Sequence, residues 1–325
     1  MVDKLEEKQK PTKPTKPTKS TKPIKSTKSI SIQLQKPFLK WIGGKTQIIN
    51  TVLKYVPLEM DNYHELFLGG GSVLLAVLTL QKHNKIIIKN KIYASDLNKE
   101  LINLYKNIQT NKEELFKYIT KYIDEYDIVG ALIPQPTESG IASKESYYYW
   151  LRTKFNTMDK NTIEYSALFL FLNKTCFRGM YREGPSGFNV PYGHYKKTPT
   201  IISKSELDKI SELIKDVEFS CCDFSNSIKN VKKGDYVYLD PPYVPENEKS
   251  FVGYTINGFN LDTHNKLFAE IAKLNEDEIK FSLSNAKVKL VIDAFPNYKC
   301  EDILARRAIN SKKPGSITTE IIISN

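Results

Sequence analysis

The sharpest chemical signal in the sequence is the tetrapeptide Asp240-Pro241-Pro242-Tyr243, which directly follows an apolar run over 236–239. Such a run is typical of a buried strand. The two prolines fix the backbone and lack amide donors, so carbonyl oxygens are left to accept hydrogen bonds. A carboxylate and such a carbonyl can accept both hydrogens of an exocyclic amino group, and the tyrosine ring can stack on the base that carries it. The alternative, a Pro-Pro turn that only ends a strand, is disfavoured by the motifs upstream.

A glycine-rich turn over 67–72, with the sequence FLGGGS, lies between a predicted strand over 63–68 and an apolar helix over 73–80. Glycines allow the backbone to approach a ligand and leave helix N–H groups free to donate. The turn does not have the G-x-G-x-x-G pattern of nicotinamide-binding proteins. The next predicted strand ends in an acid, Asp96, which lies 27 residues after Gly69. A glycine triplet alone also fits a tight turn, but with a strand-end acid that can bind ribose hydroxyls it favours an adenosine-type ligand.

A third motif, FLKWIGGKT over 38–46, ends in Gly44-Lys45-Thr46. The P-loop pattern G-x-x-x-x-G-K-T would need a glycine at position 39, which is Leu39, and no predicted strand precedes the segment. A nucleotide triphosphatase is therefore disfavoured.

A fourth segment, 174–197, carries five basic residues and one acid, with five aromatic residues interleaved. Cationic side chains suit phosphates, and aromatic and amide groups suit bases and sugars. A solvated loop would explain the charge but not the aromatics, so the segment predicts a nucleic-acid contact. Another aromatic cluster, Tyr147 to Trp150, is interpreted as ordinary core packing.

Short apolar runs alternate with amphipathic stretches from residue 37 onward, which predicts a doubly wound α/β sheet. The predicted strands cover 63–68, 91–96, 217–220, 236–239, 280–284 and 317–323. Residues 112–199 break the alternation and are expected to be an insertion between two halves of one sheet, 37–111 and 200–325.

The chain has 325 residues, of which 40% are apolar, and a net charge of +11. Residues 1–36 hold ten lysines and only three acids, with Lys-Pro-Thr triplets that favour disorder. We interpret them as a solubilising tail in preference to a phosphate-binding arm or a nuclear address. The four cysteines are expected to be reduced core thiols, and no apolar run approaches the roughly 20 residues of a membrane span.

Taken together, the four motifs resemble those of the Dam-type DNA adenine-N6 methyltransferases, in the family order of glycine motif, target-recognition domain and Asp-Pro-Pro-Tyr. The resemblance covers roughly residues 37–325. It implies a Rossmann-like methyltransferase fold with a mostly parallel seven-stranded sheet, helices on both faces, and an inserted, mainly helical target-recognition domain at 112–199. It also implies S-adenosyl-L-methionine as cofactor, no metal, and duplex DNA as partner, with transfer of a methyl group to N6 of a flipped adenine.

The resemblance assigns roles to individual positions. The implied catalytic residues are Asp240, Pro241, Pro242 and Tyr243. The implied cofactor-binding residues are Trp41, Gly43, Lys45, Phe67, Gly69, Gly71, Ser72, Asp96, Asp223, Phe224 and Asp240. The implied DNA-binding residues are Lys174, Arg178, Tyr181, Arg182, Asn189, Tyr192, His194, Lys196 and Lys197. Residues 244–260 are expected to form a wall over the flipped base, and 251–254 and Ser284-Asn285 resemble later family segments.

One departure concerns the sequence that is read. Enterobacterial Dam enzymes have an arginine just before the F-N-V-P stretch that helps read a guanine, whereas this chain has Gly184-Pro185-Ser186-Gly187. GATC specificity therefore does not carry over.

Several alternatives stay open. An RNA adenine or protein glutamine methyltransferase is the nearest enzyme alternative, and a non-catalytic DNA-binding regulator is the alternative from another class. A monomer or weak dimer is expected, and a partner restriction endonuclease is left open. No apolar segment follows Met1, which predicts an intracellular, cytoplasmic protein, or a nuclear or viral-factory protein if a eukaryote-infecting virus encodes it.

Overall fold

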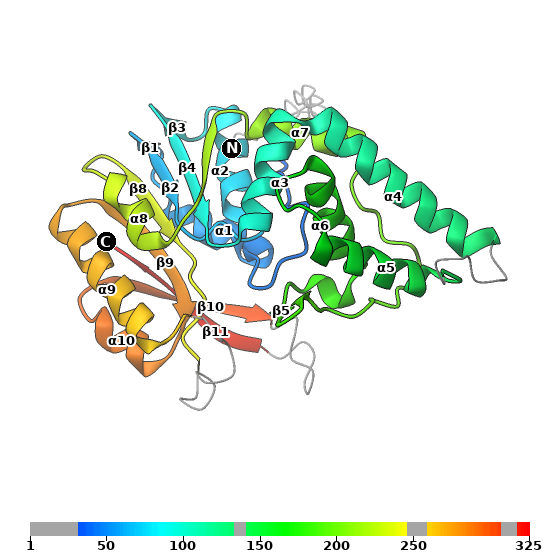
Figure 1. The fold of residues 1–325 in the computed structure, drawn as a ribbon. Coiled ribbons are helices and arrows are strands. Elements are labelled where there is room, and N and C mark those ends of the chain that lie inside the picture. Colours follow the sequence, from blue (N-terminus) through cyan, green and yellow to red (C-terminus); the bar gives the residue numbers. More distant parts are fainter. Residues whose placement is uncertain (1–31, 133–140, 246–258, 307–316) are drawn as a thin grey trace, which may run out of the picture. The chain divides into compact units, whose positions relative to one another are not determined.

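Seven strands form the central sheet in the computed structural model, in the order β10-β11-β9-β8-β2-β4-β7 (Figure 1). The strands are β2 (Tyr63–Glu65), β4 (Ile92–Asp96), β7 (Val217–Cys221), β8 (Tyr236–Leu239), β9 (Lys280–Ala286), β10 (Lys299–Arg306) and β11 (Ile317–Ser324). Neighbours among β7, β4, β2, β8 and β9 pair in parallel, and β11 is antiparallel to both β9 and β10. The mostly parallel seven-stranded sheet is thus confirmed. The structure describes residues 32–132, 141–245, 259–306 and 317–325.

The strand order reverses at β2, which pairs with β4 on one side and with β8 on the other. In open α/β sheets the crevice at such a point, outside the carboxyl ends of the strands, is where ligands bind. Here the glycine-rich turn follows β2, Asp96 ends β4, and the Asp-Pro-Pro-Tyr segment follows β8. The topology therefore brings two of the predicted motifs and the predicted strand-end acid to one edge of the sheet.

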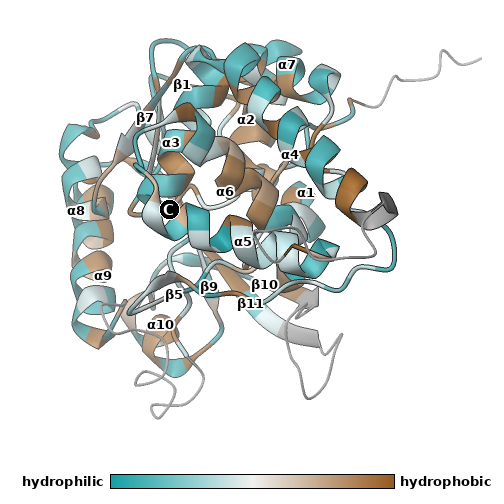
Figure 2. Ribbon diagram, turned by 45° about the vertical axis from the view of Figure 1, so that its right-hand side comes forward, coloured by the Kyte–Doolittle hydropathy of each residue, from teal (hydrophilic) through white to brown (hydrophobic). Residues whose placement is uncertain are grey.

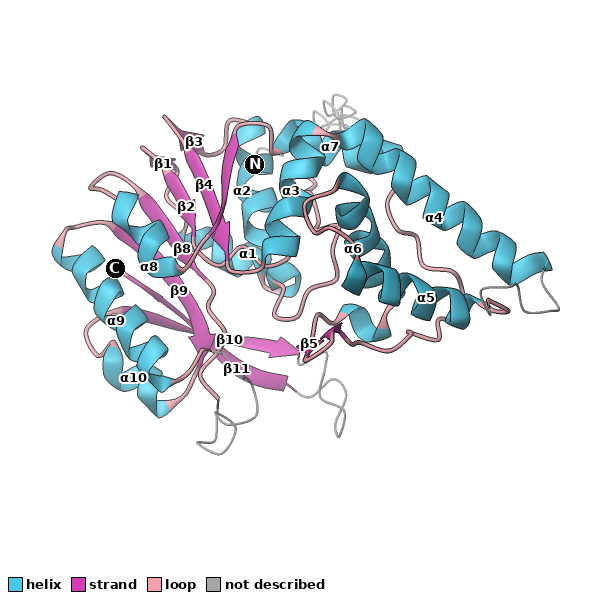
Figure 3. Cartoon of the chain, in the orientation of Figure 1, coloured by secondary structure: helices cyan, strands magenta, loops and turns pink. Residues whose placement is uncertain are grey.

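Apolar cores cover both faces of the sheet. Along β8, Tyr236 and Tyr238 belong to a core shared with α2 (Ser72–Lys82) and α3 (Lys99–Thr110). Val237 and Leu239 belong to a second core with α9 (Leu261–Glu276) and α10 (Lys289–Ala294). Alternate residues of a strand point to opposite faces, so this division follows directly from the pleat. The predicted helices on both faces are confirmed (Figure 3).

The helical segment between α3 and the rest of the sheet is described over 112–132 and 141–199. It contains α4 (Lys112–Leu132), α5 (Lys144–Thr157), α6 (Ile163–Thr175), the 3-10 turn η3 (Phe177–Gly179) and a hairpin of β5 (Glu183–Gly184) and β6 (Gly187–Phe188). Helix α6 is buried along most of its length, and Figure 2 shows both α2 and α6 largely in the brown of apolar residues. Its side chains share one continuous core with α2 and α3. Helix α7 (Lys204–Leu213) then leads back to the sheet through β7.

The remaining short elements connect these layers. They are η1 (Lys45–Gln47), α1 (Ile49–Val52), η2 (Leu53–Tyr55), β1 (Glu59–Met60), β3 (Ile87–Ile88), α8 (Phe224–Ser227) and η4 (Ile228–Asn230). Within the described residues, no helix combines the length and the apolar character that crossing a membrane would need.

Two expectations need correction. The strand predicted over 63–68 ends at Glu65, because the apolar residues that follow bend into the glycine-rich turn. The cysteines are all free, but only Cys176 is a buried core thiol; Cys221 and Cys300 are exposed and Cys222 is half-buried. Cys221 and Cys300 lie on β7 and β10, the last and first strands in the order of the sheet among the described residues. In the Tyr147–Trp150 cluster, Tyr147 and Tyr148 are buried as predicted, whereas Tyr149 is half-buried and Trp150 is exposed, because successive residues of α5 point to different sides of the helix.

Candidate active site

Lys45 joins three of the predicted motifs. Its Nζ atom donates a hydrogen bond of 2.6 Å to Oδ2 of Asp240 and one of 2.7 Å to the carbonyl oxygen of Gly43. Its backbone N–H donates to Oγ of Ser72 at 3.0 Å. The side chains of Lys45 and Asp240 are only 4% and 19% exposed. The N-terminal block, the start of α2 and the Asp-Pro-Pro-Tyr segment thus meet at one largely buried ion pair.

The Asp-Pro-Pro-Tyr segment is held by side chains from two further strands. The Tyr243 hydroxyl donates to Oε2 of Glu320 on β11 at 3.0 Å, and the Val244 N–H donates to Oδ1 of Asn285 on β9 at 3.1 Å. The Nζ atom of Lys45 lies 5.0 Å from the centre of the Tyr243 ring. Sequence reasoning did not find Glu320, because nothing in an apolar strand of this kind marks one acid as facing the site.

Burial dominates the electrostatics of this site. It raises the pKa of Asp240, while the positive charge and hydrogen bond of Lys45 act in the opposite direction. Glu65, at the end of β2, is fully buried; desolvation raises its pKa to about 8, and the charge of Asp240 adds to the rise. The Tyr63 hydroxyl donates to Glu65 at 2.6 Å. Glu65 is therefore mostly protonated at neutral pH, and it is another residue that no sequence motif indicated.

The glycine-rich turn is fixed to the end of β4. The Gly69 N–H donates to Oδ2 of Asp96 at 2.8 Å, and the Asn98 N–H donates to Oδ1 of the same residue at 2.9 Å. Desolvation raises the pKa of Asp96. Gly71 has a φ of +67°, and a Cβ atom there would lie 2.1 Å from the Tyr105 hydroxyl. Both the backbone conformation and the space at position 71 thus require glycine.

Trp41 lies against the same turn. A Cβ atom at Gly69 would lie 3.0 Å from the Trp41 ring, and a Cβ atom at Gly70 would lie 2.9 Å from the Cβ atom of Trp41. The structure therefore places Trp41, Lys45, Ser72, Asp96 and the glycines around one edge of the sheet.

The predicted pair Asp223 and Phe224 follows β7, next to the end of β4. Oδ1 of Asp223 accepts a hydrogen bond from the Ser225 N–H at 2.8 Å, which caps α8. Phe224 is buried, and its ring centre lies 5.8 Å from that of Phe67. Phe259 packs against both rings. Phe67 and Phe224, two of the three predicted aromatic cofactor residues, thus belong to one cluster.

The predicted DNA-binding residues differ in exposure. The exposed ones are Arg178, Arg182, Asn189, His194, Lys196 and Lys197. Lys174 is half-buried, and desolvation lowers its pKa. Tyr192 is buried, and its hydroxyl lies 2.5 Å from that of Tyr126, so it packs inside the helical segment. Their roles toward DNA stay predictions.

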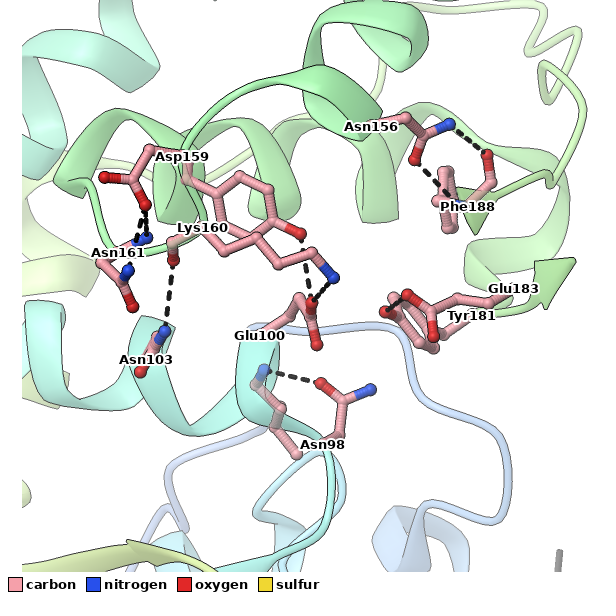
Figure 4. Close-up of polar contacts among 12 residues, drawn as sticks. Asn98, Glu100, Asn103, Asn156, Asp159, Lys160, Asn161, Tyr181, Glu183 and Phe188 are labelled. Atoms are coloured by element: carbon pink, nitrogen blue, oxygen red, sulfur yellow. Dashed lines mark hydrogen bonds and ion pairs between the residues drawn. The ribbon is translucent and has the colours of Figure 1, made fainter. Parts of the chain in front are cut away.

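Polar contacts fix the helical segment and its hairpin. Asn156 on α5 pairs through both side-chain atoms with the backbone of Phe188, at 2.9 and 3.0 Å (Figure 4). Glu100 on α3 accepts hydrogen bonds from Lys160 at 2.9 Å and from the Tyr165 hydroxyl at 3.1 Å. The predicted wall over 244–260 lies mostly outside the described residues, since 246–258, including 251–254, are not described. Among the residues that are described, no group of three or more His, Cys, Asp or Glu side chains could hold a metal ion.

The chain is similar to known proteins over most of its length. The family model described as D12 class N6 adenine-specific DNA methyltransferase matches residues 41–309. A protein of Methanocaldococcus jannaschii named type II methyltransferase M.MjaIII is 35% identical over 287 residues, 85% of this chain and 93% of the relative. The type II methyltransferase M1.LlaDCHI of Lactococcus lactis subsp. cremoris is 30% identical over 299 residues, 89% of this chain and 95% of the relative.

A DNA adenine methylase of Haemophilus influenzae is 28% identical over 293 residues, which cover 89% of this chain and 93% of that protein. The family match spans well over half of the chain and contains the Lys45–Asp240 pair, the glycine-rich turn and the helical segment. The chain belongs to the D12 class of N6 adenine-specific DNA methyltransferases.

Proposed function

We propose that the chain transfers a methyl group from S-adenosyl-L-methionine to N6 of an adenine flipped out of a short duplex DNA site. The observation that carries this proposal is the junction at Lys45, which holds the Asp240 carboxylate beside the start of α2 and the glycine-rich turn. Family membership gives the reaction class, and the junction supports the role proposed here for Asp240.

The residues at the sheet edge fit the cofactor. Gly69, Gly70 and Gly71 have no side chains, so the backbone of the turn can approach a ligand, and Asp96 is held at the adjacent strand end. Asp96 accepts backbone hydrogen bonds from Gly69 on Oδ2 and from Asn98 on Oδ1, and a carboxylate has about four acceptor sites, so it can still accept a hydrogen bond from a ribose hydroxyl. Trp41, Ser72, Asp223 and the Phe67–Phe224 cluster would complete the site. When bound, S-adenosyl-L-methionine supplies an electrophilic methyl group on a sulfonium.

Asp240 acts on the amino group. The lone pair of an exocyclic amine is delocalised into the purine ring, so a neutral adenine is a weak nucleophile. Hydrogen bonds from N6 to the Asp240 carboxylate and to the Pro241 carbonyl favour a pyramidal nitrogen whose lone pair is available. The same acceptors stabilise the positive charge that develops on N6, which is electrostatic preorganisation. Asp240 need not remove a proton first, because the nitrogen becomes acidic only once it carries the methyl group and the positive charge, and its proton then passes to the Asp240 carboxylate or to water.

Lys45 and Glu320 support this chemistry from either side. Lys45 offsets the burial of Asp240 and favours its ionised form, which is the form that accepts hydrogen bonds. Glu320 accepts the hydroxyl hydrogen of Tyr243 and so orients the ring on which the base stacks. An adenine inside a duplex cannot reach this site, so the base must be flipped out.

The helical segment 112–199 would be the DNA target-recognition domain. Exposed Arg178, Arg182, Lys196 and Lys197 suit phosphates, and the β5–β6 hairpin is the candidate for base contacts. Two relatives are named type II methyltransferases, which supports a role in restriction–modification with a partner endonuclease.

The experiment offers labelled S-adenosyl-L-methionine with unmethylated duplex DNA, with RNA and with protein, followed by hydrolysis and product analysis. We expect label in N6-methyladenine from DNA alone. Label in RNA or in glutamine would support the alternative enzymes. A folded protein that binds DNA and labels no substrate would support a non-catalytic regulator.

A further inference from the structure

One aromatic contact joins the segment proposed to read DNA to the turn proposed to hold the cofactor. The ring of Tyr181, between η3 and β5, stacks on Trp41 with centres 6.1 Å apart and planes 21° apart. Phe169 and Phe188 enclose the other sides of the Tyr181 ring, each with its centre 5.7 Å away. Tyr181 is thus held by Trp41 on one side and by the helical segment on the other.

The Trp41 end of this contact reaches the cofactor turn. Its ring fills the space beside Gly69, where even a methyl group would approach it to 3.0 Å. Gly69 in turn donates its N–H to Asp96. A displacement of the Trp41 ring would therefore shift both the glycine-rich turn and Asp96.

The Tyr181 end reaches the hairpin. The Tyr181 hydroxyl donates to Oε1 of Glu183 on β5 at 2.8 Å, as Figure 4 shows. Next to it, Nε of Arg182 donates to Oδ1 of Asn189 at 2.6 Å, and the Asn189 N–H donates to the Arg182 carbonyl at 3.1 Å. Both Arg182 and Asn189 are exposed. A ligand that binds Arg182 and Asn189 therefore contacts the residue that follows Tyr181 in the chain and the residue that pairs with it across the hairpin.

Other contacts fasten the helical segment as well. Glu100, Lys160 and Tyr165 connect α3 to the start of α6, and Asn156 fixes Phe188 to α5. Phe169 on α6 also contacts Trp41, edge to face with ring centres 6.5 Å apart, and the Asn173 side chain exchanges two hydrogen bonds with the backbone of Lys40, at 3.0 and 2.8 Å. Tyr181 differs from these residues because it directly precedes Arg182 and Glu183 of the hairpin, so its stack on Trp41 joins the hairpin to the residue beside the cofactor turn.

We propose that Tyr181 is a positioning residue that couples DNA binding at the β5–β6 hairpin to cofactor binding at the glycine-rich turn through Trp41, so that each ligand tightens the binding of the other. The inference rests on the proposed function, because it takes the hairpin as a DNA contact and the turn as a cofactor contact. Coupling of this kind is reciprocal and is measured as a ratio of affinities.

The test measures the affinity for S-adenosylhomocysteine, which cannot donate a methyl group, with and without a long, unmethylated DNA made by PCR. We expect DNA to tighten cofactor-analogue binding by between about twofold and about tenfold, the range that one aromatic pair supports. Tyr181→Ala should reduce the ratio to one, and Tyr181→Phe should retain it, because the ring contacts remain when the hydroxyl is lost. Tyr118→Ala, a half-buried tyrosine on α4, is the matched control and should behave as wild type.

Fluorescence provides a second readout that a merely structural role would not change. The chain has two tryptophans, Trp41 and Trp150, so Trp150→Phe leaves Trp41 as the only indole. In that background DNA should change Trp41 emission, and adding Tyr181→Ala should abolish the change while circular dichroism shows a folded protein.

The proposal is overturned if the affinity ratio is one in the wild type, or if Tyr181→Ala keeps the wild-type ratio. In both cases the proposed function still stands if the wild type methylates the same DNA when S-adenosyl-L-methionine replaces the analogue. A wild type that binds the analogue but methylates no DNA would instead refute the proposed function.

Discussion

At the scale of single residues, the Lys45–Asp240 pair determines the charge of the site. Lys45→Met removes the cation that opposes the burial of Asp240, so the pKa of Asp240 should rise further above its ordinary 3.8. The loss of one partner of a buried pair is costly, and we expect at least about a tenfold fall in kcat at neutral pH.

The same substitution should change the pH profile. Activity requires ionised Asp240, so kcat falls as the pH falls, and in Lys45→Met this fall should begin at a higher pH than in the wild type. The pH dependence of single-turnover methyl transfer measures it, with Lys54→Met, an exposed lysine nearby, as control. An unshifted acid limb would show that Lys45 does not control the Asp240 charge.

Glu65 makes the second residue-scale prediction, on stability. Its pKa is about 8 in the folded protein and near 4.5 when unfolded, so the folded state keeps a proton that the unfolded state releases. This stabilisation is complete below pH 4.5 and is lost as the pH rises through about 8. Glu65→Gln should remove up to about 1.4 kcal/mol per pH unit from the slope of the unfolding free energy in this window.

Urea denaturation across the pH range measures the slope. Glu114→Gln, an exposed glutamate on α4, should keep the wild-type slope. If Glu65→Gln kept it as well, Glu65 would be ionised in the folded protein.

At the scale of elements, the glycine-rich turn predicts a difference between two glycines. Gly71 and Gly43 both have positive φ, but a Cβ atom would meet the Tyr105 hydroxyl at Gly71 and nothing within 4 Å at Gly43. Gly43→Ala should cost only the conformational strain, about 1–2 kcal/mol of unfolding free energy. Gly71→Ala should cost about 1–3 kcal/mol more through overpacking.

A second substitution separates strain from overpacking. In a Tyr105→Phe background the additional cost of Gly71→Ala should shrink, because the hydroxyl at 2.1 Å is removed. Equal costs of Gly71→Ala in the two backgrounds would show that the turn relaxes away from Tyr105.

The elements also show what the sequence can and cannot predict. Strand β8 was predicted to the residue, because an apolar run ends sharply at Asp240 and two prolines. Strand β2 was predicted three residues too long, because apolar side chains line a buried turn as readily as a strand. Strand β10 was missed, because charged and apolar residues do not alternate regularly along this edge strand. The sequence therefore predicts the order of the motifs and of the secondary-structure elements, but not which side chains of different elements contact each other.

The candidate site shows the same limit. Asp96, Asp240 and the glycines follow strands in the sequence, so local pattern was enough to find them. Glu320 meets Tyr243 across 77 positions of sequence, and its approach depends on β11 lying antiparallel beside β9. Only the order of strands in the sheet reveals that contact. The stack of Tyr181 on Trp41 likewise follows from tertiary packing.

At the scale of the whole molecule, charge bears on how the protein meets DNA. Residues 1–31 hold nine lysines and lie outside the described residues. If they act as a solubilising tail, as the sequence predicts, their removal should leave the methylated sequence and the salt dependence of DNA binding unchanged. Affinity measured over a series of salt concentrations checks this, since each lost phosphate contact would flatten the logarithmic slope by about 0.9. A flatter slope after removal of 1–31 would identify a phosphate-binding arm.

The central claim is that Asp240, held by Lys45 beside the glycine-rich turn, presents an adenine amino group for methylation. Methylation-aware sequencing of DNA from cells that express the wild type or Asp240→Ala tests it most directly. The account predicts N6-methyladenine at one short site in every copy with the wild type, and none above background with Asp240→Ala at equal expression. Methylation at that site by Asp240→Ala, or methylation of cytosine by the wild type, would contradict it.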